Sequence, residues 1–195
     1  SDVKILVLYN KSEDDTRRAI DRACSKWPFI TAVGMDGDPG YSDKFREMFR
    51  IARDSEWVWT FGDDDKLQPG ALKFILERLK NAIPELSFIH VAERRRSAGT
   101  NHTFTGRLID LCCTYGWLEM TGFITGNITR GSFLGKCADV PDWDFYAESA
   151  FVQSCALLDV LLTEQAQFID MPLVDTQEES QTPECAARWD AENIA

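Results

Sequence analysis

The sequence contains no apolar run that approaches the 18 or so residues needed to cross a lipid bilayer. It has only two histidines, and none of its six cysteines forms a Cys-x-x-Cys pair, so a zinc site is not expected. Basic residues are also few, with 21 Lys and Arg against 32 Asp and Glu and a formal net charge of -11. Because nucleic-acid binding depends on Lys and Arg contacts with phosphate, nucleic acid is not an expected partner.

The cysteine usage bears on the cellular compartment. Six cysteines without a Cys-x-x-Cys pair favour reduced, mostly buried thiols and a cytoplasmic protein. Glycosylation sequons at Asn10, Asn101 and Asn127 would favour a secreted protein, but such triplets are short and common by chance. Without an apolar span, any contact with a membrane would be peripheral, at its inner face.

Strand-like and helix-like segments alternate through the first half of the chain. Short β-branched and aromatic runs predict strands in 3–10, 29–34, 56–61 and 85–93. Helical spacing predicts helices over 12–27, with Ser12 as N-cap, over 41–54, and from Pro69 onward with Leu72 on its inner face. Strands that alternate with helices favour an α/β fold, with a mainly parallel sheet flanked by helices in a single domain.

The second half of the chain has a weaker pattern. Residues 94–106 read as a polar loop, and the glycine-rich stretch 116–135 mixes short elements. A helix is expected over about 144–162 and a strand over 166–174. From residue 176 the chain is an acidic, polar tail with the composition of disordered segments.

Carboxylates follow two of the expected strands. Asp36 lies in an acidic turn after the second strand, and Asp63, Asp64 and Asp65 come directly after the third. In open α/β sheets, ligands bind outside the carboxyl ends of the strands, so both turns are expected to converge on one crevice. Clustered carboxylates repel one another, and Mg or Mn would relieve that repulsion. The alternative is that the triplet is an ordinary solvated turn.

Three stretches of the first half carry a family resemblance: ILVLYNK at 5–11, VGMDGDPG at 33–40 and SEWVWTFGDDDKLQPGAL at 55–72. They resemble family 2 glycosyltransferases, which have the Rossmann-like GT-A fold and bind nucleotide sugars. The triplet is most similar to the pattern of abequosyltransferase-like enzymes of bacterial surface polysaccharide synthesis. TGFITGNITRGSF at 121–133 resembles the segment that follows the acceptor loop in this family.

The resemblance implies a role for each matching residue. Tyr9 would lie against the nucleobase, and Asp36 would contact the base or ribose. Asp64 would bind the divalent cation, Mn or Mg, while Asp63 and Asp65 would hold ribose, sugar or metal. Lys44 would reach the base or the diphosphate. Each has a structural alternative: Tyr9 as a strand-end aromatic, Asp36 as a turn former and Lys44 as a solvated helix residue.

The sequence departs from the family pattern in several places. Gly62 replaces the first aspartate of the usual Asp-x-Asp, and no Glu-Asp pair supplies an obvious base. Asp142, Asp144 and Glu148 lie in about the right region to take the proton of an acceptor hydroxyl, with helix capping as the alternative role. Trp117 and Trp143 would either stack on an acceptor sugar or belong to the core.

The resemblance therefore implies an inverting, metal-dependent hexosyltransferase-type enzyme. Residues 1–92 would bind the nucleoside-diphosphate sugar, 93–175 would form the acceptor side of the same domain, and 176–195 would be the tail. The acceptor would be a hydroxyl of a glycan or of a lipid-linked sugar. Because the Gln-x-x-Arg-Trp signature of processive synthases is missing at 185–189, with Cys185 in place of Gln, addition of single sugars is favoured.

Two other functions fit parts of the sequence. A nucleotidyltransferase would use the same acidic site for a nucleoside triphosphate, although the opening loop LYNKSEDD is acidic instead of basic and glycine-rich. A non-catalytic module that binds calcium or carbohydrate is suggested by DGDPGYSDKFRE at 36–47, which has acidic residues at positions one, three and twelve of an EF-hand-like loop. That stretch has Tyr41 where the sixth-position glycine belongs.

Overall fold

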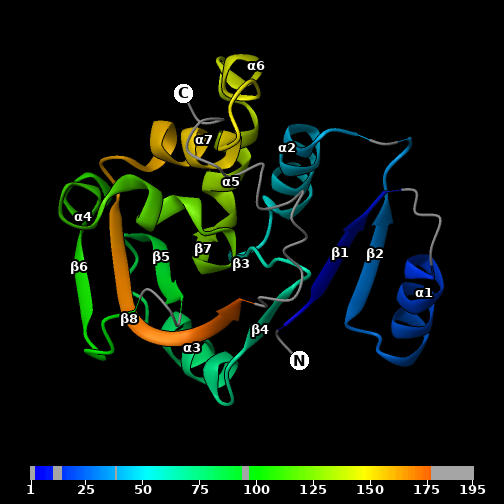
Figure 1. Ribbon diagram of the computed structural model, residues 1–195, viewed down its shortest axis with the longest axis horizontal. Helices are drawn as coiled ribbons and strands as arrows, with labels where there is room; N and C mark the ends of the chain where they lie inside the picture. The colour runs from blue at the N-terminus through cyan, green and yellow to red at the C-terminus, as the bar shows by residue number, and fades with distance from the viewer. Residues whose placement is uncertain (1–2, 11–14, 38, 94–96, 177–195) are drawn as a thin grey trace. The chain divides into compact units, whose positions relative to one another are not determined.

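The computed structural model describes residues 3–10, 15–37, 39–93 and 97–176, and it has the expected α/β character. The chain divides into two compact units, Ser1–Met48 and Phe49–Ala195 (Figure 1). The expected boundary between nucleotide and acceptor halves, near residue 92, falls inside the second unit. No helix in the described part of the chain is both long enough and apolar enough to span a bilayer.

The first unit opens with a strand, a helix and a second strand, as the sequence predicts. Strand β1 (Ile5–Tyr9) pairs in parallel with β2 (Ile30–Gly34), and α1 (Thr16–Lys26) connects them. Asp15 precedes α1, and the expected N-cap Ser12 lies outside the described residues. Helix α2 (Tyr41–Ala52) follows within the expected range.

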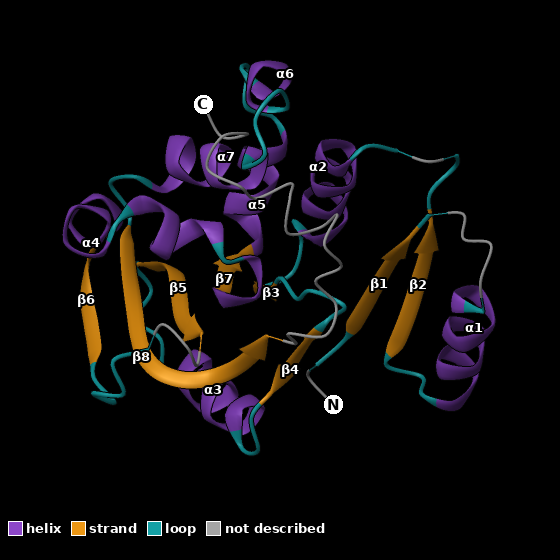
Figure 2. Cartoon of the chain, in the orientation of Figure 1, coloured by secondary structure: helices purple, strands orange, loops and turns teal. Residues whose placement is uncertain are grey.

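The second unit contains a mixed sheet, which corrects the prediction of a mainly parallel one. Its strands lie in the order β3-β7-β5-β8-β4, and β6 also pairs with β8 (Figure 2). The strands are β3 (Trp57–Trp59), β4 (Asp65–Leu67), β5 (Leu86–Glu93), β6 (Thr103–Arg107), β7 (Asn127–Arg130) and β8 (Gln165–Thr176). Within the described residues, β5 and β8 are this sheet's parallel pair, and its other pairings are antiparallel.

The sheet is covered by helices on both faces (Figure 1). Helix α3 (Ala71–Lys80) buries Ala71 and Ile75 against one face, in a cluster with Ile89, Ile128 and Ile169. The other face is covered by α4 (Leu108–Tyr115), α5 (Gly131–Ala138) and α7 (Val152–Leu161). Because both faces are covered, β5 is buried along its whole length, as the sequence of that strand predicts.

Three local predictions are wrong. The expected loop 94–106 contains β6, whose alternating polar residues lack the apolar run of a buried strand. The expected helix 144–162 is two helices, α6 (Trp143–Tyr146) and α7, with a break between them. Helix α3 starts after Gly70, which has a φ of 84°, and Leu72, expected on its inner face, is exposed, whereas Ala71 and Ile75 are buried.

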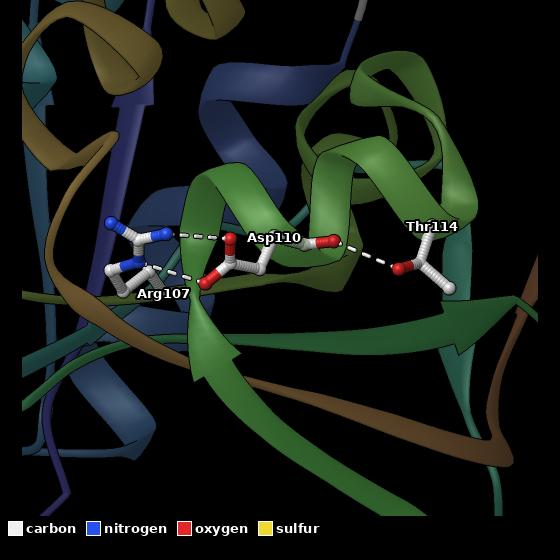
Figure 3. A network of polar contacts seen from close by, with 3 residues as sticks. All are labelled: Arg107, Asp110 and Thr114. Atoms are coloured by element: carbon white, nitrogen blue, oxygen red, sulfur yellow. Dashed lines mark hydrogen bonds and ion pairs between the residues drawn. The ribbon is translucent and has the colours of Figure 1, made fainter.

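A short polar network marks the start of α4, directly after β6 (Figure 3). Arg107 Nε and Nη2 each donate a hydrogen bond of 2.8 Å to the two carboxylate oxygens of Asp110. The Asp110 carbonyl accepts a 2.8 Å hydrogen bond from the Thr114 hydroxyl. The hydrogen bonds from Arg107 lower the pKa of Asp110. Because both side chains are exposed, the effect of this ion pair is confined to the first turn of the helix.

Candidate functional site

The acidic triplet spans a turn and the start of a strand. Asp63 and Asp64 are exposed in the turn that follows β3, whereas Asp65 is half-buried and is the first residue of β4. The turn is closed by a backbone hydrogen bond of 3.4 Å from Asp65 N to Gly62 O. The alternative prediction, that the triplet is a solvated turn, therefore fits Asp63 and Asp64 but not Asp65.

Thr125 joins the two ends of this turn. It is 1% exposed and lies in the short helix η2 (Ile124–Gly126), just before β7. Its hydroxyl accepts a hydrogen bond of 2.8 Å from Gly62 N and donates one to Asp65 Oδ2. Its carbonyl accepts a 2.7 Å hydrogen bond from Trp59 Nε1, on β3. Sequence analysis missed Thr125 because nothing in a single Thr-Gly pair signals a contact 60 residues away.

Side-chain oxygens converge beside Gly62. If Gly62 had a Cβ, that atom would lie 2.9 Å from Asp65 Oδ2, 3.1 Å from Asp64 Oδ1 and 3.2 Å from Thr125 Oγ1. These distances are shorter than ordinary van der Waals contacts, so the three oxygens lie too close to this position for a side chain larger than that of glycine to fit without a shift. Two adjacent aspartates of the triplet thus present oxygens to one point, although Asp63 is not among them.

The electrostatics of the turn act on Asp65. Partial burial raises the pKa of this carboxyl, and the hydrogen bond from Thr125 opposes that shift. The nearby carboxylates of Asp64, Glu93 and Asp63 raise the pKa further. A cation placed among these groups would favour the charged form of Asp65 and relieve the repulsion.

Glu93 is a second residue that sequence analysis missed. It ends β5, is 7% exposed, and its Oε1 accepts a 2.6 Å hydrogen bond from the Thr176 hydroxyl. Thr176 in turn stands opposite Asp65 in the pairing of β4 with β8. The signal for Glu93 was present: it is a carboxylate at the end of an otherwise apolar strand, the place where open sheets bind ligands.

The residues expected to bind the nucleotide belong to the first unit. Tyr9 ends β1, and its ring atoms would lie 3.2 Å from a Cβ on Gly34, so the ring covers that glycine of β2. Asp36 follows β2 and is exposed, and Lys44 is half-buried on α2. Tyr9 and Asp36 thus follow the carboxyl ends of neighbouring parallel strands, as the sequence predicts.

The prediction that β2 and β3 belong to one parallel sheet is wrong. Strand β3 pairs with β7 in antiparallel register, with Trp57 opposite Arg130 and Trp59 opposite Ile128. Arg130 also lies over the Trp57 ring, 4.4 Å from its centroid. This pairing places β3, and the triplet after it, in the sheet of the second unit, while β1 and β2 form a sheet of their own.

The three candidate bases lie around α6. Asp142 precedes the helix and its carbonyl accepts a 2.9 Å hydrogen bond from Tyr146 N, while its side chain makes no capping hydrogen bond. Asp144 and Glu148 are exposed, like Asp142. Helix α6 and strand β4 lie at opposite ends of the second unit (Figure 1), so this structure does not bring these carboxylates to the triplet.

The two tryptophans considered for sugar stacking differ in exposure. Trp143 is 2% exposed and packs edge-on against Phe49, with ring centroids 6.3 Å apart, so it belongs to the core. Trp117 is 46% exposed and contacts Phe151 edge-on at 5.8 Å. Only the second of these rings has a surface that an acceptor sugar could reach.

Asp170 is a buried carboxylate outside the triplet. It is 4% exposed on β8 and accepts hydrogen bonds from the hydroxyls of Ser97 (2.7 Å) and Thr100 (2.5 Å) and from the amides of Ala98 (2.9 Å) and Thr100 (3.3 Å). Burial raises the pKa of this carboxyl, but the hydrogen bonds from Thr100 and Ser97 outweigh burial and leave the pKa below its usual value. Because all of its contacts are to one turn, Asp170 has a structural role.

The acidic turn does not form a preformed metal cage. In the residues that the structure describes, no cluster of three or more His, Cys, Asp and Glu side chains is arranged to hold a metal. Mg²⁺ in phosphate-binding sites commonly uses one or two carboxylates, with water and the substrate's phosphates completing the shell. Asp64 and Asp65 are the two carboxylates of the turn with an oxygen close to Gly62.

Comparisons with known proteins add no family. The sequence matches no model of a known protein family and no curated protein.

Proposed function

We propose that the protein is a metal-dependent, inverting glycosyltransferase that moves one sugar from a nucleoside-diphosphate donor to a hydroxyl of a glycan or lipid-linked acceptor. The observation that supports this most is that carboxylate oxygens of Asp64 and Asp65 lie close together beside Gly62. That geometry adds to the resemblance of 55–72 to the nucleotide-sugar site of family 2 glycosyltransferases.

In this proposal, each group of the chain has a defined task. Asp64 and Asp65 hold the cation, which when bound supplies positive charge to the diphosphate leaving group. Asp63 contacts ribose or sugar, and the nucleoside contacts that the resemblance implies for Tyr9, Asp36 and Lys44 stay predictions. The acceptor oxygen forms a bond to the anomeric carbon, the bond from that carbon to the diphosphate breaks, and a carboxylate accepts the acceptor's proton.

Asp142, Asp144 and Glu148 are the candidate bases that the resemblance implies, and all three are exposed. A base must lie within hydrogen-bond reach of the acceptor hydroxyl, so the distance of α6 from β4 in this structure counts against them. A cytoplasmic enzyme that meets a lipid-linked acceptor would do so by peripheral contact at the inner membrane face.

The structure argues against a calcium-binding loop at 36–47. Helix α2 begins at Tyr41, the sixth position of that stretch, and β2 stands where an EF-hand has its first helix. Positions seven to twelve therefore lie on a helix and do not wrap around one ion.

The proposal is tested by titrating UDP, GDP, CDP and dTDP, with and without Mn²⁺, by isothermal calorimetry. We expect one nucleotide to bind more tightly by at least roughly tenfold when Mn²⁺ is present, because the cation bridges phosphate and carboxylates. Equal binding of all four with and without Mn²⁺ would contradict the proposal. Hydrolysis of the matching nucleotide sugar then separates a transferase from a nucleotidyltransferase, which would instead release pyrophosphate from the triphosphate.

A further inference from the structure

Large apolar side chains are exposed together at one end of the first unit, where the parallel strands β1 and β2 begin (Figure 1). Trp27 and Phe29 lie in the loop between α1 and β2 and are 45% and 36% exposed, and Ile5, at the start of β1, is 43% exposed. The two aromatic rings contact each other with centroids 5.8 Å apart. Ile5 N donates a 2.9 Å hydrogen bond to Phe29 O. These three residues are therefore neighbours, and we call them the Trp27 patch.

Cationic side chains flank the Trp27 patch. Lys4 and Lys26 directly precede members of the patch in the sequence, and Arg22 lies one turn before Lys26 on α1. All three are exposed, and Lys26 Nζ lies 5.0 Å from the centroid of the Trp27 ring. In the described part of the chain, none of these three cations forms an ion pair. Their charges are therefore available to an anionic partner, although the chain as a whole carries a net charge of -11.

The backbone of the loop that carries the two aromatic rings is largely paired. Trp27 N donates a 2.9 Å hydrogen bond to the last turn of α1, and Ile30 N donates one of 3.0 Å to Trp27 O. Pro28 has no N–H, and Phe29 O accepts the hydrogen bond from Ile5. Unpaired N–H and C=O groups are costly away from water. A loop that pairs most of them internally enters an apolar environment at a low cost.

We propose that the Trp27 patch is a docking surface for a bilayer that contains anionic lipid: Trp27 and Phe29 enter the headgroup region, while Arg22 and Lys26 contact lipid phosphates. Aromatic rings favour the interface between lipid and water, and Lys and Arg beside them are attracted to anionic headgroups. The charge of the patch is complementary to such a surface. This inference does not rest on the proposed function.

Docking at this end leaves the other end of β1 and β2 uncovered. Because the two strands are parallel, the Trp27 patch lies at their amino ends, whereas Tyr9 and Asp36 lie at their carboxyl ends. The residues predicted to bind the nucleotide would therefore stay open to the solution while the patch holds the bilayer.

The first test is co-sedimentation of the full chain with lipid vesicles, without Mn²⁺ or nucleotide. We expect binding to vesicles of phosphatidylglycerol, which is anionic, at least roughly tenfold tighter than binding to vesicles of phosphatidylcholine, which has no net charge. Raised ionic strength should weaken the binding to phosphatidylglycerol, because salt screens the exposed cations. Absence of binding to phosphatidylglycerol, or equal binding to both lipids, overturns the inference.

The role of the aromatic rings is tested by substitution. Trp27→Ala and Phe29→Ala should each weaken binding to phosphatidylglycerol vesicles by roughly tenfold, because each removes a large ring from an apolar environment. Phe145→Ala is the matched control, since it removes a ring that is 72% exposed on α6, outside the patch. Circular dichroism checks that each variant is folded. Wild-type binding by both folded patch variants overturns the inference.

The role of the cations is tested in the same way. Lys26→Glu should weaken binding to phosphatidylglycerol vesicles by roughly tenfold or more, because it places a like charge against the anionic surface. Lys80→Glu makes the same charge change at an exposed position at the end of α3 and should have little effect. Equal losses in the two variants would show that net charge, and not the patch, governs the binding.

Insertion of the ring has its own spectroscopic readout. Tryptophan fluorescence of the wild type should shift to shorter wavelength on phosphatidylglycerol vesicles. Trp27→Phe should lose most of this shift and keep its vesicle affinity within about threefold, because an aromatic ring remains. A full shift in Trp27→Phe would show that Trp27 stays outside the lipid and overturns the inference.

A second copy of the chain is the alternative occupant of the patch. Analytical ultracentrifugation that finds a dimer in the wild type and a monomer in Trp27→Ala, together with no vesicle binding, overturns lipid docking in favour of self-association. Because the vesicle assays contain no nucleotide, their failure leaves the proposed function standing. Failure of the nucleotide titrations in turn leaves the docking surface standing.

Discussion

Asp65 stands directly opposite Thr176 in the antiparallel pairing of β4 and β8, and the Thr176 hydroxyl donates a 2.6 Å hydrogen bond to Glu93 Oε1. The pairing ties the start of β4 to the end of β5 through one residue of β8. It explains why the charge of Glu93 contributes to the raised pKa of Asp65. Three strands that are distant in sequence thus bring Asp65, Thr176 and Glu93 together.

Asp64→Asn should remove cation-dependent nucleotide binding and leave the fold intact. Asp64 is exposed in the turn, so the side chain stays in contact with water after its charge is removed. We expect the Mn²⁺-dependent affinity to fall by at least roughly tenfold, the scale seen when groups around a metal are altered. Calorimetry measures the affinity, and the exposed Asp54→Asn is the matched control for charge. Equal loss in both variants would mean that net charge, and not Asp64 itself, governs binding.

Gly62→Ala should displace the carboxylate oxygens beside Gly62. The added Cβ would lie 2.9 Å from Asp65 Oδ2, which Thr125 holds in place, so the carboxylate must turn away. We expect a roughly tenfold loss of Mn²⁺-dependent affinity. The melting temperature should change little, because only the far end of a side chain has to move. Gly106→Ala is the control, since a Cβ at that position meets no atom within 4 Å. A Gly62→Ala protein with wild-type affinity would show that the arrangement of these oxygens does not govern binding.

Sequence reasoning succeeded where a local pattern sufficed. The apolar run at 85–93 is a strand buried throughout, and the helical spacing over 41–54 corresponds to α2, which buries Phe45, Phe49 and Ala52. Asp36 and the triplet follow strands, as expected, because strand ends can be read from the change from apolar to acidic residues. These features depend on neighbours within a few residues.

It failed where partners come from distant segments. Asp65 belongs to β4 because of its pairing with Thr176, more than 100 residues later, and no local signal marks a three-residue strand. Strand β7 has the sequence NITR, which contains one large apolar side chain. Nothing in these four residues indicates an antiparallel strand between β3 and β5. Thr125 was missed for the same reason, because its partners Trp59, Gly62 and Asp65 lie 60 or more residues earlier.

The candidate bases can be separated by their effect on turnover. Asp142→Asn, Asp144→Asn and Glu148→Gln should each leave donor affinity unchanged, because α6 lies at the far end of the second unit from β4 (Figure 1). The one that acts as base should lower kcat by roughly a hundredfold or more. Steady-state kinetics with the acceptor measure this. If all three variants keep wild-type kcat, the base lies elsewhere in the chain.

Gly131→Ala should destabilise the second unit strongly. A Cβ on Gly131 would lie 2.2 Å from Ser55 O and 2.8 Å from the carbonyl oxygens of Ala52 and Arg53, so backbone has to move. We expect a loss of at least about 2 kcal/mol in the free energy of unfolding, measured by urea denaturation. Gly135→Ala, in the same helix, meets only the Arg53 side chain, at 3.2 Å or more, and should cost far less. Similar losses for the two variants would contradict the close backbone approach at Gly131.

Asp170→Asn should destabilise the turn at 97–101 in a pH-dependent way. The Asp170 carboxylate accepts hydrogen bonds from Ser97, Ala98 and Thr100, and an amide would direct its NH₂ donor toward some of those donors. At neutral pH the loss should be about 1–3 kcal/mol, the cost of leaving buried partners of a charged group unsatisfied.

The sign of the pH dependence follows from the lowered pKa of Asp170 in the folded protein. A lowered pKa means that the unfolded chain binds the proton more readily, so the stabilisation by Asp170 is fully present above its unfolded pKa, about 3.9. It is lost as the pH falls from there through the folded pKa. The difference in unfolding free energy between wild type and Asp170→Asn should therefore be constant from pH 7 to about pH 5 and shrink below about pH 4. A difference that grows on acidification would show that Asp170 is not held as the carboxylate by this turn.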